Sequence, residues 1–421
     1  MRHCFRFLSV ITLLPALSAA LAAAEPQSHI TDKDWPWWRG PNRNGVAVEG
    51  QSPPITWSET EHVQWKAPLP GKGHGSPVIV GDQIFLQTAE REPDRQIVLC
   101  FDRKTGEPQW QTVVHTGGAV PKQNEKSTAA NSTPACDGEF LFVNFLHAGA
   151  VYTTALDRAG QQKWQVKITD YVLHQGFSSS PAIYESLVIV SADNKGTGAV
   201  AALDRQTGEV VWKQSRPALP NYTSPIILHA AGRDQVFFIG CDLVTSLDPK
   251  TGKKLWELPG ATTECVTSTV TDGKLIYTTG GYPKNHLAAV AADGSKAGVW
   301  ESPSRVYVPS MVLKDGFLYA MLDAGVAQCW QADTGKELWK QRVGGTFSSS
   351  LVLVNEKIYV TDEAGKTTIF AADPAGFRLI AENQLGDEVF ATPAICGSRI
   401  YQRVAFTAEG QRQELLYCLG E

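Results

Sequence analysis

The chain has 421 residues, and 38 lysines and arginines stand against 43 aspartates and glutamates, which gives a formal net charge of −5. This near balance excludes the basic surface that nucleic-acid binding requires, so we expect no nucleic-acid partner. Tryptophan occurs 12 times and methionine only 3 times. Because aromatic side chains suit pleated strands, this composition predicts a sheet-rich protein rather than a helical one.

The first 24 residues have the pattern of an export signal. Arg2 and Arg6 form a basic start, residues 7–21 are nearly all apolar, and residues 22–24 are alanines that suit a cleavage site. The apolar run is short for a membrane span and no later stretch is long enough, so we expect no transmembrane segment, with a lone anchor as the alternative. No cysteine follows the alanines to carry a lipid. The sequence therefore predicts a signal peptide over residues 1–24 and a soluble protein in the periplasm or outside the cell.

Removal of the signal would leave seven cysteines, an odd number for an oxidising compartment. Cys100 and Cys418 occupy the same position of the repeat described below, and a disulfide requires Cα atoms within about 7 Å. Packed sheets lie about 10 Å apart, so we favour buried free thiols over a Cys100–Cys418 bridge.

Residues 25–54 form a tryptophan-rich lead-in that contains "DWPWWRGPNRNG", Asp34–Gly45. Its three tryptophans and Arg39 could form a ligand platform, since a guanidinium can stack on an indole. The favoured interpretation is structural. We expect these side chains to pack across the surface of one of the following repeats and to hold the N-terminus in place.

From residue 55 to residue 421 the sequence consists of eight repeats. Each repeat opens with a small hydroxyl residue followed by an anchor residue, and the anchors recur every 40 to 57 residues. A period of this length with four short strands is typical of a β-propeller blade. The anchors are Pro77, Pro134, Pro181, Pro225, Thr269, Met311, Leu351 and Pro393.

The third repeat shows the four strands most clearly. We expect them in "SPAIYES", "LVIVSA", "GAVAALD" and "EVVWKQ", separated by turn-forming residues such as Gln206-Thr207-Gly208. The last repeat lacks a fourth strand, whereas "EHVQWKAPLP" before the first anchor is a strand without a repeat. This N-terminal strand would complete the last blade and remove the open sheet edges of an unclosed ring. The sequence predicts an all-β, eight-bladed propeller of four-stranded antiparallel blades over residues 55–421.

A tryptophan recurs in the outermost strand of seven blades, and the seventh repeat has Ile380 at this position. A large apolar ring with one N–H donor suits a contact between neighbouring blades, so we predict a structural docking role. The docking tryptophans are Trp65, Trp110, Trp164, Trp212, Trp256, Trp300 and Trp339.

The block "ALDRQTGEVVW", Ala202–Trp212, matches the tryptophan-docking motif of PQQ-like (pyrroloquinoline quinone repeat) β-propellers, and six copies are recognisable. The chain resembles that superfamily over nearly all of its mature length. It resembles the outer membrane protein assembly factor BamB family, whose propeller is non-catalytic, and more distantly the eight-bladed quinoprotein dehydrogenases. Because enzymes and non-enzymes share the motif, the resemblance implies the fold and leaves the function open.

In a propeller of this strand order, the loops that lead into the innermost strands gather around one mouth of the central channel. We expect them to form a polar and aromatic funnel for a small ligand or a peptide, with lysines and an arginine able to meet an anionic group. The alternative is a polar mouth that holds only water. The candidate ligand-binding residues are Lys72, His74, Lys126, Asn131, His174, Tyr222, Glu264, Arg305, Tyr307 and Phe347.

The resemblance to quinoprotein dehydrogenases implies pyrroloquinoline quinone with calcium, a pair of adjacent disulfide-linked cysteines and an aspartate base. No adjacent cysteines occur here. Glu264 is the one acid expected at the mouth, whereas calcium takes about six to eight oxygen ligands. Zinc, nucleophile and phosphate-loop motifs do not occur either. We therefore predict no catalytic residue, no metal and no cofactor, and a binding or scaffold module for a protein or an envelope polymer. A quinone- and calcium-dependent dehydrogenase is the alternative.

Overall fold

The computed structural model describes Met1, residues 30–118 and residues 124–421. Most of the predicted signal peptide, residues 2–24, lies outside the described residues. Among those that are described, no helix is long and apolar enough to cross a membrane.

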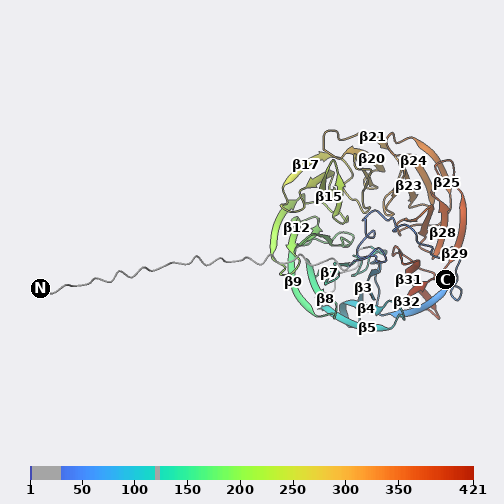
Figure 1. Ribbon diagram of the computed structural model, residues 1–421, viewed down its shortest axis with the longest axis horizontal. Helices are drawn as coiled ribbons and strands as arrows, with labels where there is room; N and C mark the ends of the chain where they lie inside the picture. The colour runs from blue at the N-terminus through green and yellow to red at the C-terminus, as the bar shows by residue number, and fades with distance from the viewer. Residues whose placement is uncertain (2–29, 119–123) are drawn as a thin grey trace.

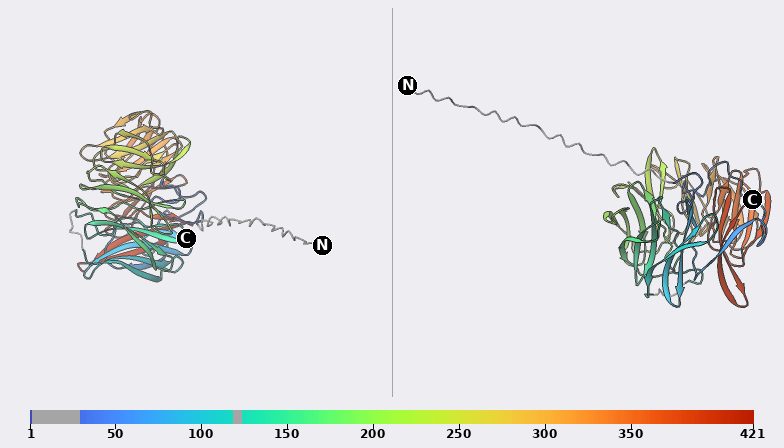
Figure 2. Two further views of the ribbon diagram at one scale, coloured as in Figure 1. Left: turned by 90° about the vertical axis from the view of Figure 1, so that its left-hand side faces the viewer. Right: turned by 60° about the horizontal axis from the view of Figure 1, so that its bottom comes forward.

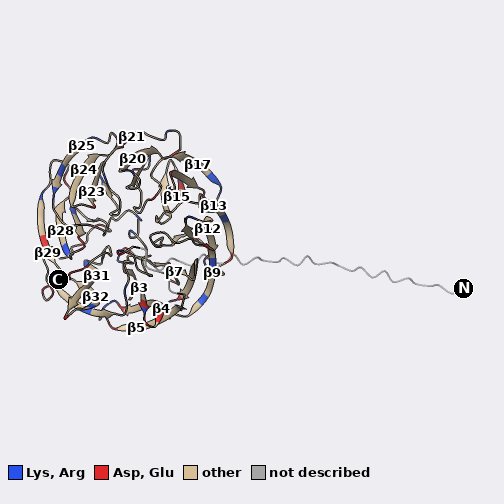
Figure 3. Ribbon diagram, turned by 180° about the vertical axis from the view of Figure 1, so that it is seen from behind, with Lys and Arg blue, Asp and Glu red and all other residues tan. Residues whose placement is uncertain are grey.

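Eight four-stranded antiparallel sheets surround a central axis, which confirms the predicted propeller (Figure 1). Seen from the side, the ring is a thick disc (Figure 2). Basic and acidic residues are interspersed around it (Figure 3). Blades 1 to 4 contain β2 (Val78–Val80), β3 (Gln83–Arg91), β4 (Asp94–Asp102) and β5 (Pro108–Thr116); β6 (Ala135–Cys136), β7 (Phe140–His147), β8 (Ala150–Asp157) and β9 (Gln162–Asp170); β10 (Ala182–Tyr184), β11 (Leu187–Ala192), β12 (Gly198–Asp204) and β13 (Val210–Arg216); and β14 (Ile226–Ala230), β15 (Arg233–Gly240), β16 (Leu243–Leu247) and β17 (Lys254–Pro259).

The remaining blades follow the same order, and blade 8 takes its outermost strand from the N-terminal part of the chain. Blades 5 to 8 contain β18 (Val270–Thr271), β19 (Leu275–Gly280), β20 (His286–Ala291) and β21 (Trp300–Ser302); β22 (Val312–Lys314), β23 (Phe317–Leu322), β24 (Val326–Gln331) and β25 (Glu337–Arg342); β26 (Val352–Val354), β27 (Lys357–Thr361), β28 (Lys366–Ala371) and β29 (Leu379–Gln384); and β30 (Ala394–Cys396), β31 (Arg399–Ala408), β32 (Gln411–Leu419) and β1 (Val63–Leu69). In blade 8, β1 pairs antiparallel with β32, and Trp65 lies opposite Cys418. The predicted closure of the ring is therefore confirmed.

The turn before each outermost strand explains the repeated motif. In blade 3, Asp204 Oδ1 accepts hydrogen bonds from the backbone N–H groups of Gln206 at 3.0 Å and Thr207 at 2.8 Å. Gly208 follows with a φ of 77°, and a Cβ there would lie 2.8 Å from the ring of Trp164 in blade 2. Glycine is required because the backbone is left-handed and the indole of the neighbouring blade covers it.

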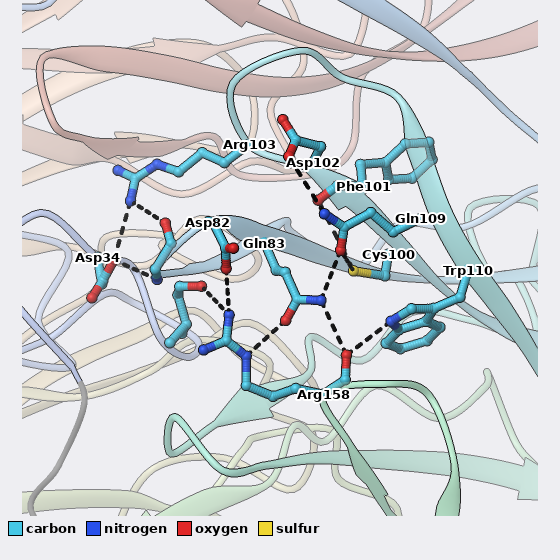
Figure 4. Close-up of polar contacts among 12 residues, drawn as sticks. Asp34, Asp82, Gln83, Cys100, Phe101, Asp102, Arg103, Gln109, Trp110 and Arg158 are labelled. Atoms are coloured by element: carbon cyan, nitrogen blue, oxygen red, sulfur yellow. Dashed lines mark hydrogen bonds and ion pairs between the residues drawn. The ribbon is translucent and has the colours of Figure 1, made fainter.

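Each docking tryptophan also donates its indole N–H to a backbone carbonyl in the next blade, at 2.8–3.2 Å. Figure 4 shows one such junction. The carbonyl of Arg158 accepts the Trp110 N–H at 2.9 Å, while the Arg158 guanidinium reaches back to Asp82 and Gln83 in blade 1, at 2.7 Å to each. The acceptors for the seven tryptophans in chain order are Arg103, Arg158, Arg205, Pro249, Ala292, Ala332 and Asp373.

The small hydroxyl residues before the anchors form a second ring of contacts around the axis, which we call the hydroxyl ring. The backbone N–H of one such residue donates to the side-chain oxygen of the equivalent residue in the next blade, so neighbouring blades are tied together at their inner ends. The structure shows six of these bonds, at 2.8–3.0 Å: Ser76 to Thr133, Thr133 to Ser180, Ser180 to Ser224, Ser268 to Ser310, Ser310 to Ser350, and Ser350 to Thr392.

The lead-in crosses the middle of the ring (Figure 1, blue) instead of packing across one blade surface as expected. Trp35 forms an antiparallel bridge with Ile79 in β2, and Val46 forms a parallel bridge with Leu353 in β26. Arg39 donates to the carbonyls of Met311 and Leu351. The physical reason is that the innermost strands present unpaired backbone groups to the axis, and the lead-in satisfies them.

Arg39 is 1% exposed, and all the acceptors of its guanidinium in the described chain are backbone carbonyls, that of Asn44 included. Burial lowers the pKa of Arg39 to about 9. The lead-in is therefore an integral part of the ring's interior rather than a loosely attached terminus.

Candidate functional site

A cavity of about 650 Å³ lies at the centre of the ring, between the hydroxyl ring and the loops that lead into the innermost strands. We call this cavity the funnel. Several hydroxyl-ring residues and Trp38 line it, together with aromatic and charged side chains from the loops. Eight of the ten residues singled out from the sequence are among its lining: His74, Lys126, Asn131, His174, Tyr222, Glu264, Arg305 and Tyr307.

The other two predicted residues lie elsewhere. Phe347 is 1% exposed and packs with Tyr319 and Leu351 in a hydrophobic cluster between blades, because its loop turns the ring inward. Lys72 lines a neighbouring cavity and lies 3.2 Å from Glu388. The aromatic side chain that reaches the funnel from blade 8 is Phe390, which stacks on His74 with ring centroids 4.2 Å apart.

The lead-in contributes one wall of the funnel through Trp38. The indole N–H of Trp38 donates to Ser268 Oγ at 2.7 Å, which ties it to the hydroxyl ring. The lead-in therefore has a structural role and also places an aromatic surface in the cavity. The sequence shows the tryptophans but not this path, since the lead-in does not share the repeat.

The cations of the funnel are engaged by neighbouring groups. Lys126 Nζ of blade 2 lies 2.7 Å from Glu363 Oε1 of blade 7. Arg305 donates to the carbonyl of Gly281 at 3.2 Å, and its guanidinium lies 5.1 Å from the centroid of the Tyr307 ring. These partners leave less positive charge for an anionic ligand than the sequence suggested.

The acidic part of the funnel centres on Glu264, which is 5% exposed. Its Oε1 lies 3.2 Å from His174 Nε2, so a blade 3 loop meets a blade 5 loop across blade 4. Tyr222 is 9% exposed, and its hydroxyl has no side-chain hydrogen-bond partner among the described residues, while the backbone N–H of Gln175 approaches its oxygen. Burial raises the pKa values of Tyr222 and Tyr307, and the nearby Glu264 carboxylate raises both further.

A buried amide holds these loops in register. Asn221 Oδ1 accepts the backbone N–H of Cys265 at 3.0 Å, and its Nδ2 donates to Asp193 Oδ2 at 3.0 Å. The carboxylate of Asp193 in turn lies 3.0 Å from Arg216 Nε. Asp193 is therefore used inside the scaffold, and Tyr222 and Glu264, the neighbours of Asn221 and Cys265, are positioned by the same network.

Two further lining residues have internal roles. Asn131 accepts from the backbone N–H of Thr128 at 2.9 Å and donates to the carbonyl of Phe177 at 3.2 Å, so it ties its own loop to the loop that enters blade 3. Asp323, which the sequence analysis missed, accepts the backbone N–H of Tyr307 at 2.9 Å, and burial raises its pKa. Its position between the second and third strands of blade 6 was the available signal, since such loops share the funnel face.

The residues present do not fit a quinone held with calcium. The described chain contains no group of three or more histidine, cysteine, aspartate or glutamate side chains arranged to hold a metal ion. Within the funnel, Glu264 is paired with His174 and Asp323 accepts a backbone N–H. All seven cysteines of the described residues are buried free thiols, Cys100 and Cys418 included. No redox step follows from this donor set.

The fold and its repeated docking motif define a PQQ-like β-propeller. The family described as outer membrane protein assembly factor BamB matches residues 40–171, 116–330 and 283–376. These segments cover most of the chain, and the chain belongs to this family.

Individual comparisons agree on the fold. The chain is 24% identical over 345 residues to the outer membrane protein assembly factor BamB of Bordetella pertussis, covering 78% of this chain and 80% of that protein. The solved structure of BamB from Moraxella catarrhalis has a TM-score of 0.60 at 15% identity, over 84% of this chain and 99% of that one. A quinohemoprotein alcohol dehydrogenase from Comamonas testosteroni has a TM-score of 0.67 at 14% identity, over 92% and 81%. At these identities the structural likeness establishes the fold alone.

Proposed function

We propose that this chain is a non-catalytic binding or scaffold module of the cell envelope, and that its funnel binds a partner protein. The observation that carries the proposal is the funnel itself. It combines Trp38, Tyr222 and Tyr307 with a buried carboxylate in a cavity of about 650 Å³. Concave sites with aromatic walls and a few placed polar groups are where proteins bind ligands.

Membership of the BamB family supports a partner in outer membrane protein assembly, as the name of the relatives indicates. The scaffold suits this role because the ring is tied at three radii: by the hydroxyl ring, by the lead-in and by the docking tryptophans. A rigid ring presents its loops without paying a large ordering cost on binding. We further propose that residues 1–24 are removed on export, which leaves the lead-in over residues 25–54 and the propeller over residues 55–421.

Site-specific photocrosslinking tests the proposed binding face. A photoreactive residue at Tyr282, which is 55% exposed and lines the funnel, should crosslink in cells to an outer membrane assembly protein identified by mass spectrometry. The matched control places the same residue at Val211, which is 52% exposed on the outermost strand β13. Crosslinks from Val211 and none from Tyr282 would place the partner on the outer rim and contradict the proposal.

The enzymatic alternative has its own test. Titration of the purified mature protein with pyrroloquinoline quinone, with and without calcium, should produce no saturable heat. One-to-one binding that requires calcium would overturn the non-catalytic assignment. N-terminal sequencing of the mature protein checks the proposed removal of residues 1–24.

A further inference from the structure

Five carboxylate residues of the described chain are at most 5% exposed, and four of them have compensating partners. Three lie within 3.1 Å of an arginine nitrogen: Asp34 with Arg103, Asp193 with Arg216, and Glu414 with Arg412. The fourth, Asp362, accepts backbone N–H groups of its own turn, from Ala364 at 3.0 Å and Lys366 at 2.9 Å. Glu264 is the exception, since its side-chain partner is His174 at 3.2 Å.

A buried carboxylate without a cationic partner is unfavourable unless something compensates its charge. The two cations that line the funnel are directed elsewhere. Arg305 lies over the Tyr307 ring and donates to Gly281, and Lys126 pairs with Glu363. Among the described residues, no lysine or arginine therefore forms an ion pair with the Glu264 carboxylate.

Tyr222 supplies a second, independent observation. Its hydroxyl is buried in the same cavity and has no side-chain partner among the described residues, while the backbone N–H of Gln175 approaches its oxygen. The second lone pair of this oxygen can still accept a hydrogen bond from a ligand. The loops that carry Tyr222 and Glu264 lie side by side. The backbone N–H of Tyr222 donates to the carbonyl of Cys265, the residue after Glu264, at 3.1 Å.

We propose that the funnel wall formed by Glu264 and Tyr222 binds a primary ammonium group of a partner polypeptide, either a lysine side chain or a free N-terminus. This inference rests on the proposed function and names the chemistry of its ligand. An ammonium group carries three N–H donors and no acceptor. It would donate one hydrogen bond to the Glu264 carboxylate and one to the Tyr222 hydroxyl oxygen.

A divalent cation fits the same wall less well. Calcium takes about six to eight oxygen ligands, and the described residues contain no group of three or more ionisable side chains arranged for a metal. An anionic ligand would be repelled by Glu264. An ammonium group fits better, because it carries one positive charge for the Glu264 carboxylate and further N–H donors for the Tyr222 hydroxyl oxygen.

Calorimetric titration with short blocked peptides tests the inference. The probes are acetyl-Gly-Lys-Gly-amide, its norleucine analogue, and Gly-Gly-Gly-amide with a free N-terminus. One ammonium peptide should bind at least about tenfold more tightly than the norleucine peptide, a difference of about 1.4 kcal/mol. Comparison of the lysine peptide with the free N-terminus identifies which source of ammonium is preferred.

Variants locate the effect. Glu264→Gln keeps the shape and removes the charge, so the preference for ammonium should disappear. Tyr222→Phe should reduce it several-fold. The control, Glu382→Gln, removes a carboxylate on the outer strand β29 and should change nothing. The melting temperature of each variant verifies that the fold is intact.

Three results would overturn the inference: equal affinity for the lysine and norleucine peptides, a preference that survives Glu264→Gln, or calcium chloride alone stabilising the wild type but not Glu264→Gln. Crosslinking from Tyr282 that persists in Glu264→Gln while the peptides fail to discriminate would reject the ammonium site and leave the proposed binding face standing. If a photoreactive residue at position 282 forms no crosslink in the otherwise wild-type chain, the binding face itself would be rejected.

Discussion

Trp57 lies parallel to Tyr359, with ring centroids 6.5 Å apart and an angle of 8° between the rings. Tyr359 occupies the position eight residues after the anchor of blade 7. In six other blades, the aromatic residue at the equivalent place in the second strand contacts the docking tryptophan of its own blade, with ring centroids 5.8–6.2 Å apart. Five of these residues lie eight positions after their anchor, and Phe237 of blade 4 lies twelve positions after Pro225. Blade 7 has Ile380 instead, and Trp57, from the segment before β1, supplies the missing indole.

Replacement of Trp57 should therefore weaken the junction at blade 7 through lost packing, since its indole N–H, unlike those of the docking tryptophans, has no hydrogen-bond partner among the described residues. Trp57 is 6% exposed, and removal of a buried tryptophan side chain lowers the free energy of unfolding by about 3–5 kcal/mol. We expect Trp57→Ala to show this loss in urea denaturation. Leu379→Ala, at a residue 49% exposed on the neighbouring strand β29, should stay within about 0.5 kcal/mol of the wild type. A neutral Trp57→Ala would show that the stacking on Tyr359 does not stabilise the ring.

Substitution of two glycines can distinguish the cost of a left-handed backbone from the cost of displacing a docking tryptophan. Gly252 has a φ of 67°, and a Cβ there would lie 2.5 Å from the Trp212 ring, whereas Gly232 has a φ of 74° and nothing within 4 Å of its Cβ position. Gly232→Ala should lower the free energy of unfolding by about 1–2 kcal/mol, the cost of a left-handed alanine. Gly252→Ala should lower it by about 1–3 kcal/mol more, because the indole must move. Equal losses in thermal denaturation would mean that the indole does not press on this turn.

The hydroxyl ring contains a natural comparison as well. Ser310 Oγ accepts the backbone N–H of Ser268 at 2.9 Å, whereas Ser76 Oγ is buried without a hydrogen-bond partner in the described chain. Ser310→Ala should lower the free energy of unfolding by about 1–3 kcal/mol, since it leaves a buried N–H unpaired. Ser76→Ala should be neutral or slightly stabilising. The reverse order of the two variants would contradict the role assigned to the hydroxyl ring.

His115 should make stability depend on pH in the acidic range. It stacks on His147 with ring centroids 4.2 Å apart, and burial, followed by repulsion from His147, lowers the pKa of His115 to about 4. A histidine in the unfolded chain has a pKa of about 6.5. Between this pH and about 4, His115 is therefore protonated in the unfolded chain and neutral in the folded chain. The free energy of unfolding should therefore decrease as the pH falls from about 6.5 to about 4, by at most about 1.4 kcal/mol per pH unit from this residue.

The measurement is chemical denaturation at a series of pH values between 4 and 7.5. His115→Gln should flatten the slope below pH 6.5. The control is His62→Asn, which removes an imidazole outside this pair, keeps a residue type that tolerates the positive φ of 59° and should keep the wild-type slope. A slope that His115→Gln leaves unchanged would assign the acid sensitivity to other groups.

The blades could be predicted because their signals are local and repeated. The ends of the strands expected in the third repeat lie within one or two residues of the ends of β10 to β13. The strand around Trp65 could be assigned to blade 8 because only the last repeat lacked a fourth strand. The position of a funnel residue such as Glu264 follows from its distance to an anchor. The direction of a side chain does not, as Phe347 demonstrates, because the backbone of each loop decides whether a ring faces the axis or the core.

The lead-in and Trp57 could not be placed from the sequence for a different reason. Several of their contacts join them to blades more than 200 residues away, such as Trp38 to Ser268 and Trp57 to Tyr359. No period relates these residues to their partners. Many of the contacts of the lead-in are to backbone groups, as those of Arg39 to Met311 and Leu351 are, and backbone acceptors carry no sequence signal.

The pairing of β1 with β32 also sets the order of events during synthesis. Because β1 is made before the seven blades that separate it from residues 411–419, the eighth sheet cannot form until all of these blades have left the ribosome. Until then Trp65 and the edge of β1 have no partner strand, and seven blades remain an open arc. A chain that stops before residue 411 could not close the ring, and the open edge of its unfinished sheet would invite pairing with strands of other chains.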